Sequence, residues 1–372
     1  MEVMRKTEDT CTCKICGFEA DSLVAHINEA HEDQGGLEAY FDEFDVRQSE
    51  VVHPKLLSGK KAPPAKVAKP AKKAIGPSLN IHGVEVPIQA KANPHVPAVN
   101  KSFHFSDHMK DVAQDVLENK KIMLVGHTGC GKSACIEQLA AHTKNGRLRV
   151  NLNGQMPISD FVGTWTVKGG DMAWVDGALP KAMREGLWLI LDEIDFAEPA
   201  ILAALNSVLE PNGNLTLKEK SDEIVTPHPN FRLFATGNSI GCMQDYRGLY
   251  QGTNIMNEAF LDRWRVYEVK YLPPEIEQEV LRSYLPRLTK AVAFKIVKVA
   301  NEIRRAFEEE EVGCTFSTRR LIDWSEMMVR HRDPMLAAEA TIFAKISKQD
   351  AAVIRGVISA NMAPNSSIKR GE

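Results

Sequence analysis

A glycine-rich run in the middle of the chain has residue types that bind phosphate. It reads Gly126, His127, Thr128, Gly129, Cys130, Gly131, Lys132 and Ser133, which fits the pattern glycine, four residues, Gly-Lys-Ser/Thr. Its glycines let the backbone turn sharply with N–H groups pointing at an anion, and a helix that begins there adds positive charge. We expect Lys132 to reach the outer phosphates of ATP and Ser133 to ligate Mg²⁺. The other interpretation is a glycine-rich turn that binds nothing.

A pair of carboxylates, Asp192 and Glu193, ends the apolar run that starts at Leu187. In open α/β sheets ligands bind at the carboxyl ends of the strands, where these side chains would emerge. Asp192 would hold Mg²⁺ through water, and Glu193 would orient and deprotonate the attacking water. The alternative is an acidic cap on the next helix, with Asp195 as the N-cap residue. Because the pair follows a complete phosphate loop by about sixty residues, it favours hydrolysis of ATP over binding alone.

Short apolar segments alternate with longer segments around these motifs. The strand-like segments are KIMLVG, LRVNL, LWLILDE and FRLFATGN, and the segments between them are long enough for helices. Strands that alternate with helices predict an α/β fold with a parallel sheet flanked by helices. We also expect a helix over 106–119, with Ser106 as its N-cap, before the first of these strands. From Pro274 onward the pattern is almost wholly helical, which predicts a small helical subdomain.

Composition divides the chain of 372 residues into four parts. We predict a small unit with two cysteines and two histidines at 1–50, a flexible linker rich in Lys, Pro and Ala at 51–78, an α/β core at 79–273, and a helical subdomain with a C-terminal tail at 274–372.

The net charge of −3 argues against attraction of the whole protein to nucleic acid or to an acidic membrane. No apolar stretch reaches the roughly 18 to 20 residues that span a bilayer, and the N-terminus lacks the apolar centre of a signal peptide. We therefore expect a cytoplasmic protein without a membrane partner.

The N-terminal unit carries cysteines and histidines at zinc-ligand spacing. Cys13 and Cys16 are separated by two residues, His26 and His31 by four, and nine residues lie between the pairs. Two thiolates and two imidazoles complete a tetrahedral Zn²⁺ site, and the metal would supply folding energy that so small a core lacks. We predict zinc at these four residues. Cys11 is an alternative to Cys13 as a ligand, and a reduced, metal-free segment is the alternative to the whole site.

The charges near this unit indicate what it contacts. Acidic residues surround the histidines, namely Glu19, Asp21, Glu29, Glu32 and Asp33. They would repel the phosphates that dominate nucleic-acid affinity, so protein docking is favoured over DNA reading. The linker, in contrast, has seven lysines and no acidic residue between Lys55 and Lys73, enough for sequence-independent contact with nucleic acid. Such a run is more often a solvated tether, so nucleic acid is a partner that the sequence permits without favouring it.

Five motifs, taken in order, resemble those of one family. The phosphate loop, LDEID, FATGN, AFLDRW and STRR are similar to those of the AAA+ ATPases of the MoxR and chelatase branch, most closely the CobS-type ATPase subunits of aerobic cobaltochelatase. The likeness runs from about Gly83 to Trp324 and includes NPHVPAVNKSFHF and VLEPNGNLTL. It implies an AAA+ core with a helical lid, ATP and Mg²⁺, and self-association into a ring, usually a hexamer. The N-terminal unit resembles the short zinc fingers of the Ros/MucR type, and a chelatase subunit has no need of such a finger.

The resemblance also implies roles for polar residues beyond the phosphate loop. Asn238, at the end of FRLFATGN, matches the sensor 1 residue that contacts the γ-phosphate or the attacking water, with a turn cap as the alternative. Arg319 in FSTRR matches the sensor 2 arginine of the lid, and Arg320 competes for that role. A guanidinium suits such a position because it meets phosphate oxygens both geometrically and electrostatically.

Arg263 in AFLDRW matches the arginine finger of the family, which acts on the nucleotide of a neighbouring subunit. Such a finger would make hydrolysis depend on assembly. Two alternatives stay open: Arg263 pairs with Asp262 on the surface, or Arg265 is the finger.

The stretch at 161–186 has hairpin character around Gly169 and Gly170. It resembles the β-hairpin insert of this branch, which faces the ring axis and contacts clients. Trp165 and Trp174 would contact such a client or, alternatively, anchor the hairpin in the core.

Three functional hypotheses follow from these features. The first is a ring-forming ATPase subunit that drives Co²⁺ insertion into a corrin by a separate catalytic subunit. The second is a MoxR-type remodeller of a protein or protein–nucleic acid client that the finger recruits, without a cobalamin role. The third is a non-catalytic adaptor, against which the acidic pair and the arginines argue.

Overall fold

The computed structural model describes residues 77–152, 154–238, 254 and 256–362, and the backbone of two short N-terminal strands. These strands, β1 (Cys11–Thr12) and β2 (Glu19–Ala20), pair antiparallel. The chain divides into two compact units, Met1–Ala74 and Ile75–Glu372. The predicted zinc ligands Cys13, Cys16, His26 and His31 lie outside the described residues, as does the lysine-rich linker, so both stay predictions.

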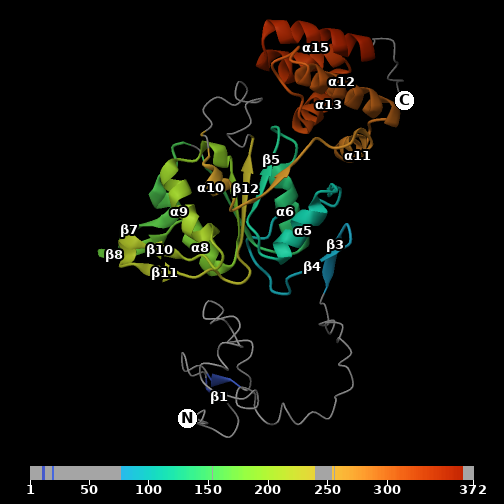
Figure 1. Cartoon of the computed structure of the whole chain (residues 1–372). Helices are drawn as coiled ribbons and strands as arrows, with labels where there is room; N and C mark the ends of the chain where they lie inside the picture. The colour runs from blue at the N-terminus through green and yellow to red at the C-terminus, as the bar shows by residue number, and fades with distance from the viewer. Residues whose placement is uncertain are drawn as a thin grey trace, which may run out of the picture. The chain divides into compact units, whose positions relative to one another are not determined.

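A five-stranded parallel sheet forms the centre of the second unit (Figure 1). Its strand order is β13-β5-β12-β9-β6, and every neighbouring pair is parallel. The strands are β5 (Ile122–Val125), β6 (Arg147–Asn151), β9 (Trp188–Asp192), β12 (Arg232–Gly237) and β13 (Arg265–Glu268). The predicted α/β fold is therefore confirmed. β13 was not predicted from the sequence, because an edge strand of four residues with charged ends has no apolar run to mark it.

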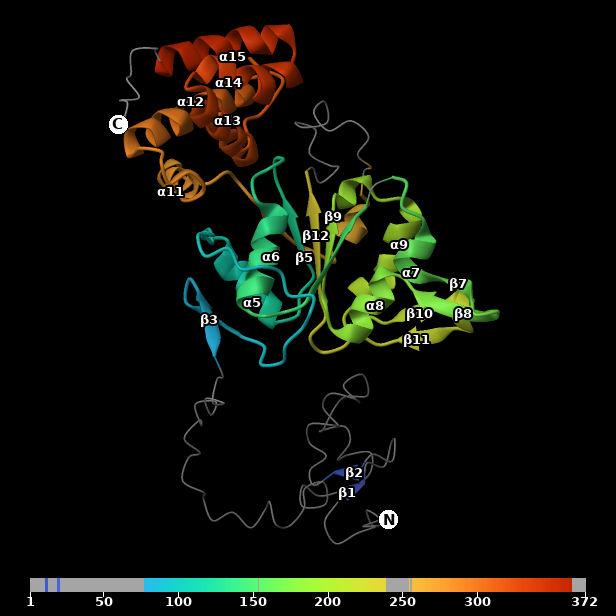
Figure 2. The same cartoon turned by 180° about the vertical axis from the view of Figure 1, so that it is seen from behind.

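Helices cover both faces of the sheet, as the two opposite views show (Figures 1 and 2). One face packs α5 (Met109–Leu117) and α6 (Lys132–His142), and the other packs α7 (Ile158–Val162), α8 (Ala178–Glu185) and α9 (Pro199–Leu209). Successive strand residues point to opposite faces, so Ile122 and Leu124 join the first core and Met123 and Val125 the second. This sandwich fixes the carboxyl ends of β5, β9 and β12, where the predicted site lies.

The start of α5 differs from the expectation. The N-cap residue is His108, which makes no capping hydrogen bond with its side chain, and Ser106 lies two residues earlier. The carbonyl of Ser106 accepts a 2.9 Å hydrogen bond from the Met109 N–H, which closes a turn ahead of the helix. Serine is favoured at helix N-caps, which is why the sequence predicts Ser106 as the cap. In the structure the backbone carbonyl of Ser106, and not its side chain, contacts the first residue of the helix.

Residues 274–361 form the predicted helical lid, which has its own hydrophobic core. The helices are α11 (Pro274–Tyr284), α12 (Lys290–Glu308), α13 (Thr318–His331), α14 (Pro334–Thr341) and α15 (Lys348–Asn361). Trp324 and Phe316 are fully buried at the centre of this core. Within the described part of the chain, no helix is long and apolar enough to span a membrane.

Three antiparallel hairpins flank the main sheet. The first joins β3 (Ser78–Ile81) to β4 (Val84–Pro87), and another joins β10 (Leu215–Leu217) to β11 (Glu223–Val225). The predicted hairpin at 161–186 is present as β7 (Gly163–Lys168) and β8 (Asp171–Asp176).

Trp165 and Trp174 are cross-strand partners in this hairpin, with ring centroids 5.7 Å apart. Trp174 packs against the main core and therefore anchors the hairpin. Trp165 remains 42% exposed and donates its indole N–H to the carbonyl of Glu219 at 2.9 Å. Trp174 is therefore a core anchor, whereas Trp165 lies on the surface.

Candidate nucleotide-binding site

The phosphate loop at 126–133 connects β5 to α6, as its sequence predicts. Gly126 and Gly129 have φ angles of +155° and +71°, which disfavour side chains. A Cβ at Gly126 would lie 2.2 Å from the Val269 carbonyl oxygen, and one at Gly129 would lie 2.5 Å from the Ser317 Cβ. Both glycines are therefore required by close contacts as well as by backbone conformation. The loop is packed between the connection after β13 and the lid.

Lys132 directs its ammonium group into this loop. Its Nζ donates hydrogen bonds to the carbonyls of Gly126 at 2.7 Å and His127 at 3.0 Å, and to Asn238 Oδ1 at 3.0 Å. The residue is 8% exposed, and this burial lowers the pKa of the ammonium. A nucleotide would present phosphate oxygens to this amine in place of neutral acceptors, and charge-assisted hydrogen bonds are the stronger kind. The cation is thus held where a triphosphate would lie in the loop.

The Ser133 hydroxyl and the Asp192 carboxylate are brought together from α6 and β9. Ser133 Oγ donates to Asp192 Oδ1 at 2.6 Å, and Thr236 Oγ1 donates to the same oxygen at 2.8 Å. Asp192 is only 4% exposed. Hydroxyl and carboxylate oxygens are ligands that suit Mg²⁺, which binds proteins through few direct contacts and keeps several waters. The donor set therefore fits the predicted metal.

Glu193 follows directly at the carboxyl end of β9, and its backbone is unusual. Its φ of +57° and ψ of +46° place it in the left-handed region, uncommon for a residue with a side chain. Strain of this kind clusters at functional sites. The short helix η2 (Ile194–Phe196) begins there with Glu193, not Asp195, as the N-cap residue. Asp195 is fully buried and accepts the backbone N–H of Asn238 at 3.0 Å, so the capping alternative does not describe its position.

Arg149 is a contact of this site that the sequence analysis did not identify. Its Nε donates to Asp192 Oδ2, and its Nη1 lies 3.7 Å from Glu137 Oε1 on α6. The residue lies on β6, which pairs with β9 so that Arg149 is opposite Ile190. An arginine inside the short strand LRVNL was the available signal, because a charged strand residue next to an acidic strand indicates a partner there.

A cavity of about 780 Å³ opens beside the phosphate loop. It is lined by residues between 100 and 106, by the loop from 128 to 131, and by the first half of α13. This volume lies in the range of small-molecule sites. The segment at 100–106, the phosphate loop and the lid therefore border a space large enough for a small-molecule ligand.

The two candidate lid arginines both line this cavity but make different contacts. Arg320 donates to the Thr315 carbonyl at 3.0 Å, within its own lid loop. Arg319 is exposed, and its Cβ would lie 3.8 Å from a Cβ at Gly129, next to the phosphate loop.

A second cavity, of about 590 Å³, lies beside Gly126 and His127 of the loop. Arg263, just after α10 (Glu258–Leu261), lines neither this cavity nor the one beside residues 128–131. Its Nε and Nη2 both lie 2.7 Å from Glu210 Oε1. The guanidinium is thus paired with Glu210, rather than with Asp262 as one alternative had it. Arg265, the other alternative, is the first residue of β13.

Two family models match the described units of the chain. The model for the AAA domain (dynein-related subfamily) matches residues 121–263, from the phosphate loop to Arg263. The model for the CbbQ/NirQ/NorQ C-terminal region matches residues 277–361, which are the lid.

Curated relatives agree with these models. The aerobic cobaltochelatase subunit CobS of Sinorhizobium sp. is 32% identical over 281 residues, 73% of this chain and 84% of that protein. An uncharacterized protein of Staphylococcus haemolyticus is 31% identical over 56% of this chain and 78% of its own length. Midasin of Dictyostelium discoideum is 28% identical over 65% of this chain, which corresponds to 4% of that very long protein.

The AAA model thus covers the phosphate loop and the acidic strand end, the CbbQ/NirQ/NorQ model covers the lid, and the CobS match extends over 73% of the chain. The chain is an ATPase and belongs to the AAA+ ATPases of the CobS and CbbQ/NirQ/NorQ (MoxR-like) branch.

Proposed function

We propose that this protein is a Mg²⁺-dependent, ring-forming motor subunit that hydrolyses ATP to drive metal insertion by a separate chelatase subunit, as in cobaltochelatase. One observation carries the motor part of the proposal: Lys132 contacts Asn238 while Ser133 contacts Asp192, so the phosphate loop meets the ends of two strands at one point. The CobS relative, which this chain matches over 84% of its length, supports the chelatase part.

Each residue of the site has a separate role in the proposed hydrolysis. Lys132 and the backbone at 126–133 would bind the phosphates, and Ser133 and Asp192 would hold Mg²⁺, which would neutralise charge on the phosphoryl oxygens. Glu193 orients the attacking water and accepts its proton. Asn238 is fixed by its backbone bond to the buried Asp195 and presents its amide to the γ-phosphate or the water. Arg319 neutralises phosphate charge from the lid, a role that its position next to Gly129 supports over Arg320.

We propose that the protein assembles into a ring in which Arg263 acts between subunits; a hexamer is expected from the family resemblance alone. Its pairing with Glu210, away from both cavities beside its own phosphate loop, supports action on the nucleotide of the adjoining subunit. An arginine supplied in trans adds charge that the single subunit lacks and makes turnover depend on association.

The N-terminal unit favours a second candidate, a MoxR-type remodeller without a cobalamin role. Met1–Ala74 is a unit separate from the rest of the chain, and the CobS relative matches 73% of this chain. A zinc finger at Cys13, Cys16, His26 and His31 on a flexible tether would recruit a client protein or, through the lysine-rich linker, a protein–nucleic acid client.

One reconstitution distinguishes the candidates. The full-length protein is mixed with a purified cobaltochelatase catalytic subunit, a corrin, Co²⁺ and Mg-ATP, and cobalt insertion is followed by absorbance. ATP-dependent insertion that the Glu193→Gln variant fails to support establishes the chelatase role. Hydrolysis of ATP without any insertion favours the remodeller, and absence of ATP hydrolysis at every protein concentration rejects both.

A further inference from the structure

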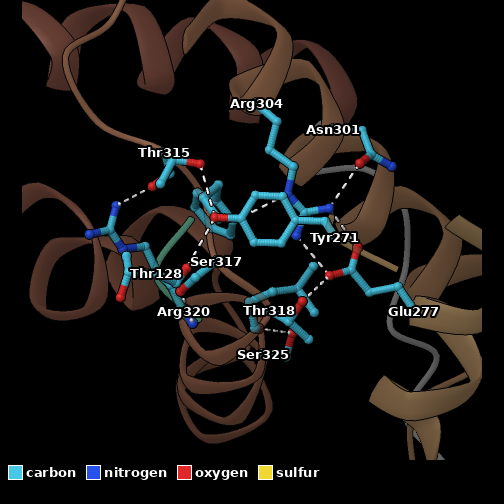
Figure 3. Close-up of polar contacts among 12 residues, drawn as sticks. Thr128, Tyr271, Glu277, Asn301, Arg304, Thr315, Ser317, Thr318, Arg320 and Ser325 are labelled. Atoms are coloured by element: carbon cyan, nitrogen blue, oxygen red, sulfur yellow. Dashed lines mark hydrogen bonds and ion pairs between the residues drawn. The ribbon is translucent and has the colours of Figure 1, made fainter. Parts of the chain in front are cut away.

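Tyr271 lies in the connection between β13 and α11, where the chain passes from the core to the lid (Figure 3). Its hydroxyl lies 3.1 Å from the carbonyl oxygen of Thr128 in the phosphate loop. The same hydroxyl lies 3.1 Å from Thr315 Oγ1, in the lid loop that precedes α13. One side chain therefore bridges the phosphate loop and the lid.

The ring of Tyr271 rests on a rigid part of the lid. The Arg304 guanidinium carbon lies 4.1 Å from the ring centroid, a cation–π distance. Arg304 is buried and binds both carboxylate oxygens of Glu277, at 2.7 and 2.8 Å, while its Nε donates to the Phe316 carbonyl at 2.7 Å. Because an arginine held by a buried bidentate carboxylate cannot shift without leaving a charge unpaired, the lid fixes where the ring lies.

The phosphate loop contacts the ring as well as the hydroxyl. The His127 imidazole is nearly parallel to the Tyr271 ring, at 8° with centroids 6.2 Å apart. His127 also meets Phe307 of α12 edge-on, with centroids 5.5 Å apart. Two consecutive loop residues, His127 and Thr128, are thus held against the core–lid connection.

Holding the Thr128 carbonyl has a consequence for phosphate binding. The carbonyl of Thr128 and the N–H of Gly129 belong to one planar trans peptide, in which they point in opposite directions. A hydroxyl that donates to this carbonyl therefore turns the Gly129 N–H away from Tyr271. N–H groups oriented in this way are what a phosphate loop uses to hold its anion.

We propose that Tyr271 is a positioning residue that orients the Thr128–Gly129 peptide for phosphate binding and does so only while Thr315 of the lid shares its hydroxyl. The inference rests on the proposed ATPase function and adds a specific link by which lid position sets nucleotide affinity. Neither phosphate nor water needs to touch Tyr271 for this role.

The test compares two tyrosine hydroxyls four residues apart. Tyr271→Phe keeps the ring and removes the bridge, while the control Tyr267→Phe removes a 2.6 Å hydrogen bond to Asp115 within the core. ATP affinity is measured by titration in the Glu193→Gln background, and kcat and KM in the otherwise unchanged chain. One lost hydrogen bond predicts a rise of about 3- to 10-fold in Kd and KM for Tyr271→Phe, with kcat within about 2-fold. Tyr267→Phe leaves both constants unchanged.

Thr315 provides an independent pair of variants. Thr315→Val removes the lid hydroxyl and predicts the same rise in Kd, whereas Thr315→Ser keeps a hydroxyl and the original affinity. In the Tyr271→Phe/Thr315→Val double variant the effects are smaller than their sum, because both remove one bridge. If Tyr271→Phe does not fold, the Thr315 pair decides the matter alone.

Equal Kd values for both tyrosine variants, or equal losses in Thr315→Ser and Thr315→Val, overturn the inference while leaving the ATPase intact. Failure of the Glu193→Gln protein to bind ATP at all is a different result and rejects the proposed function.

Discussion

Two guanidinium nitrogens of Arg263 share a single carboxylate oxygen of Glu210, each at 2.7 Å. Glu210 is the C-cap residue of α9, so its position is set by the helix that also packs the core. Exposed ion pairs contribute about 0 to 1 kcal/mol to stability, which makes a purely structural purpose for this pair weak. In the proposed arginine finger, Glu210 would hold the guanidinium of Arg263 in place.

We expect Arg263→Ala to leave ATP affinity nearly unchanged and to lower kcat by about 10³-fold, since an arginine finger acts on the transition state of the neighbouring nucleotide. Mixing this variant with Glu193→Gln subunits restores part of the activity, because intact arginines then face intact acidic pairs. Turnover against protein concentration measures the effect. Arg265→Ala is the matched control; a loss of activity with that variant instead would assign the finger to Arg265.

Variants of Lys132 and Glu193 should separate ATP binding from hydrolysis. Lys132→Ala removes the cation that three acceptors now hold, and we expect loss of ATP binding in a titration. Glu193→Gln keeps binding but lowers hydrolysis by at least about 100-fold, because general-base catalysis contributes about 10²- to 10⁴-fold. Equal loss of binding in both variants would contradict these roles.

The zinc prediction is tested on the intact chain. Purified protein should contain about one zinc per chain, by analogy with other structural sites of two cysteines and two histidines. Changing Cys16 to Ser or His26 to Ala lowers the zinc content measured by plasma mass spectrometry, whereas Cys314→Ser does not. Cys11→Ser and Cys13→Ser, compared side by side, identify the fourth ligand.

The buried thiol of Cys135 on α6 predicts a pH dependence of stability. Burial raises the pKa of Cys135 to about 12 from an ordinary value of 9.0. Because the folded protein keeps this proton longer than the unfolded chain, the contribution to stability is present below about pH 9 and is lost as pH rises toward 12.

Urea unfolding of the wild type and Cys135→Ala at pH 8 and pH 11 measures this contribution. The wild type should lose more stability over that interval than the variant. In native protein at pH 8.5, iodoacetamide should leave Cys135 unlabelled, as peptide mass spectrometry reports, and urea should expose it. Rapid labelling of native protein would show that the thiol is accessible.

The parts of the site that the sequence revealed are those encoded locally. The phosphate loop lies in a strand–loop–helix context within 122–142, and Asp192 and Glu193 end an apolar strand, so residue type and neighbours were sufficient. Trp165 and Trp174 could be placed on one hairpin from the Gly169–Gly170 turn, but their different exposure depends on packing against the rest of the core.

The contacts that were missed join residues far apart in the chain. Arg149 and Asp192 are 43 residues apart, and Thr128 and Tyr271 are 143 apart. Neither pair leaves a periodic signal, because β6 and β9 become neighbours only through the sheet order and Tyr271 contacts the loop across 143 residues of chain. Such contacts require the tertiary structure.

The absence of space between Gly129 and Ser317 restricts how this protein can change by mutation. Alanine at 129 would place a methyl group against Ser317 of the lid and would also need a φ angle that disfavours side chains. Removing the collision alone, or changing φ alone, would therefore not make alanine acceptable there. The colliding atom of Ser317 is its Cβ, so only glycine at 317 would remove the collision. That change would also remove the cap of α13, because the Ser317 Oγ accepts the Arg320 N–H at 3.1 Å. The two positions are therefore tied, and in a randomised library glycine at 129 should be recovered together with a small capping residue at 317.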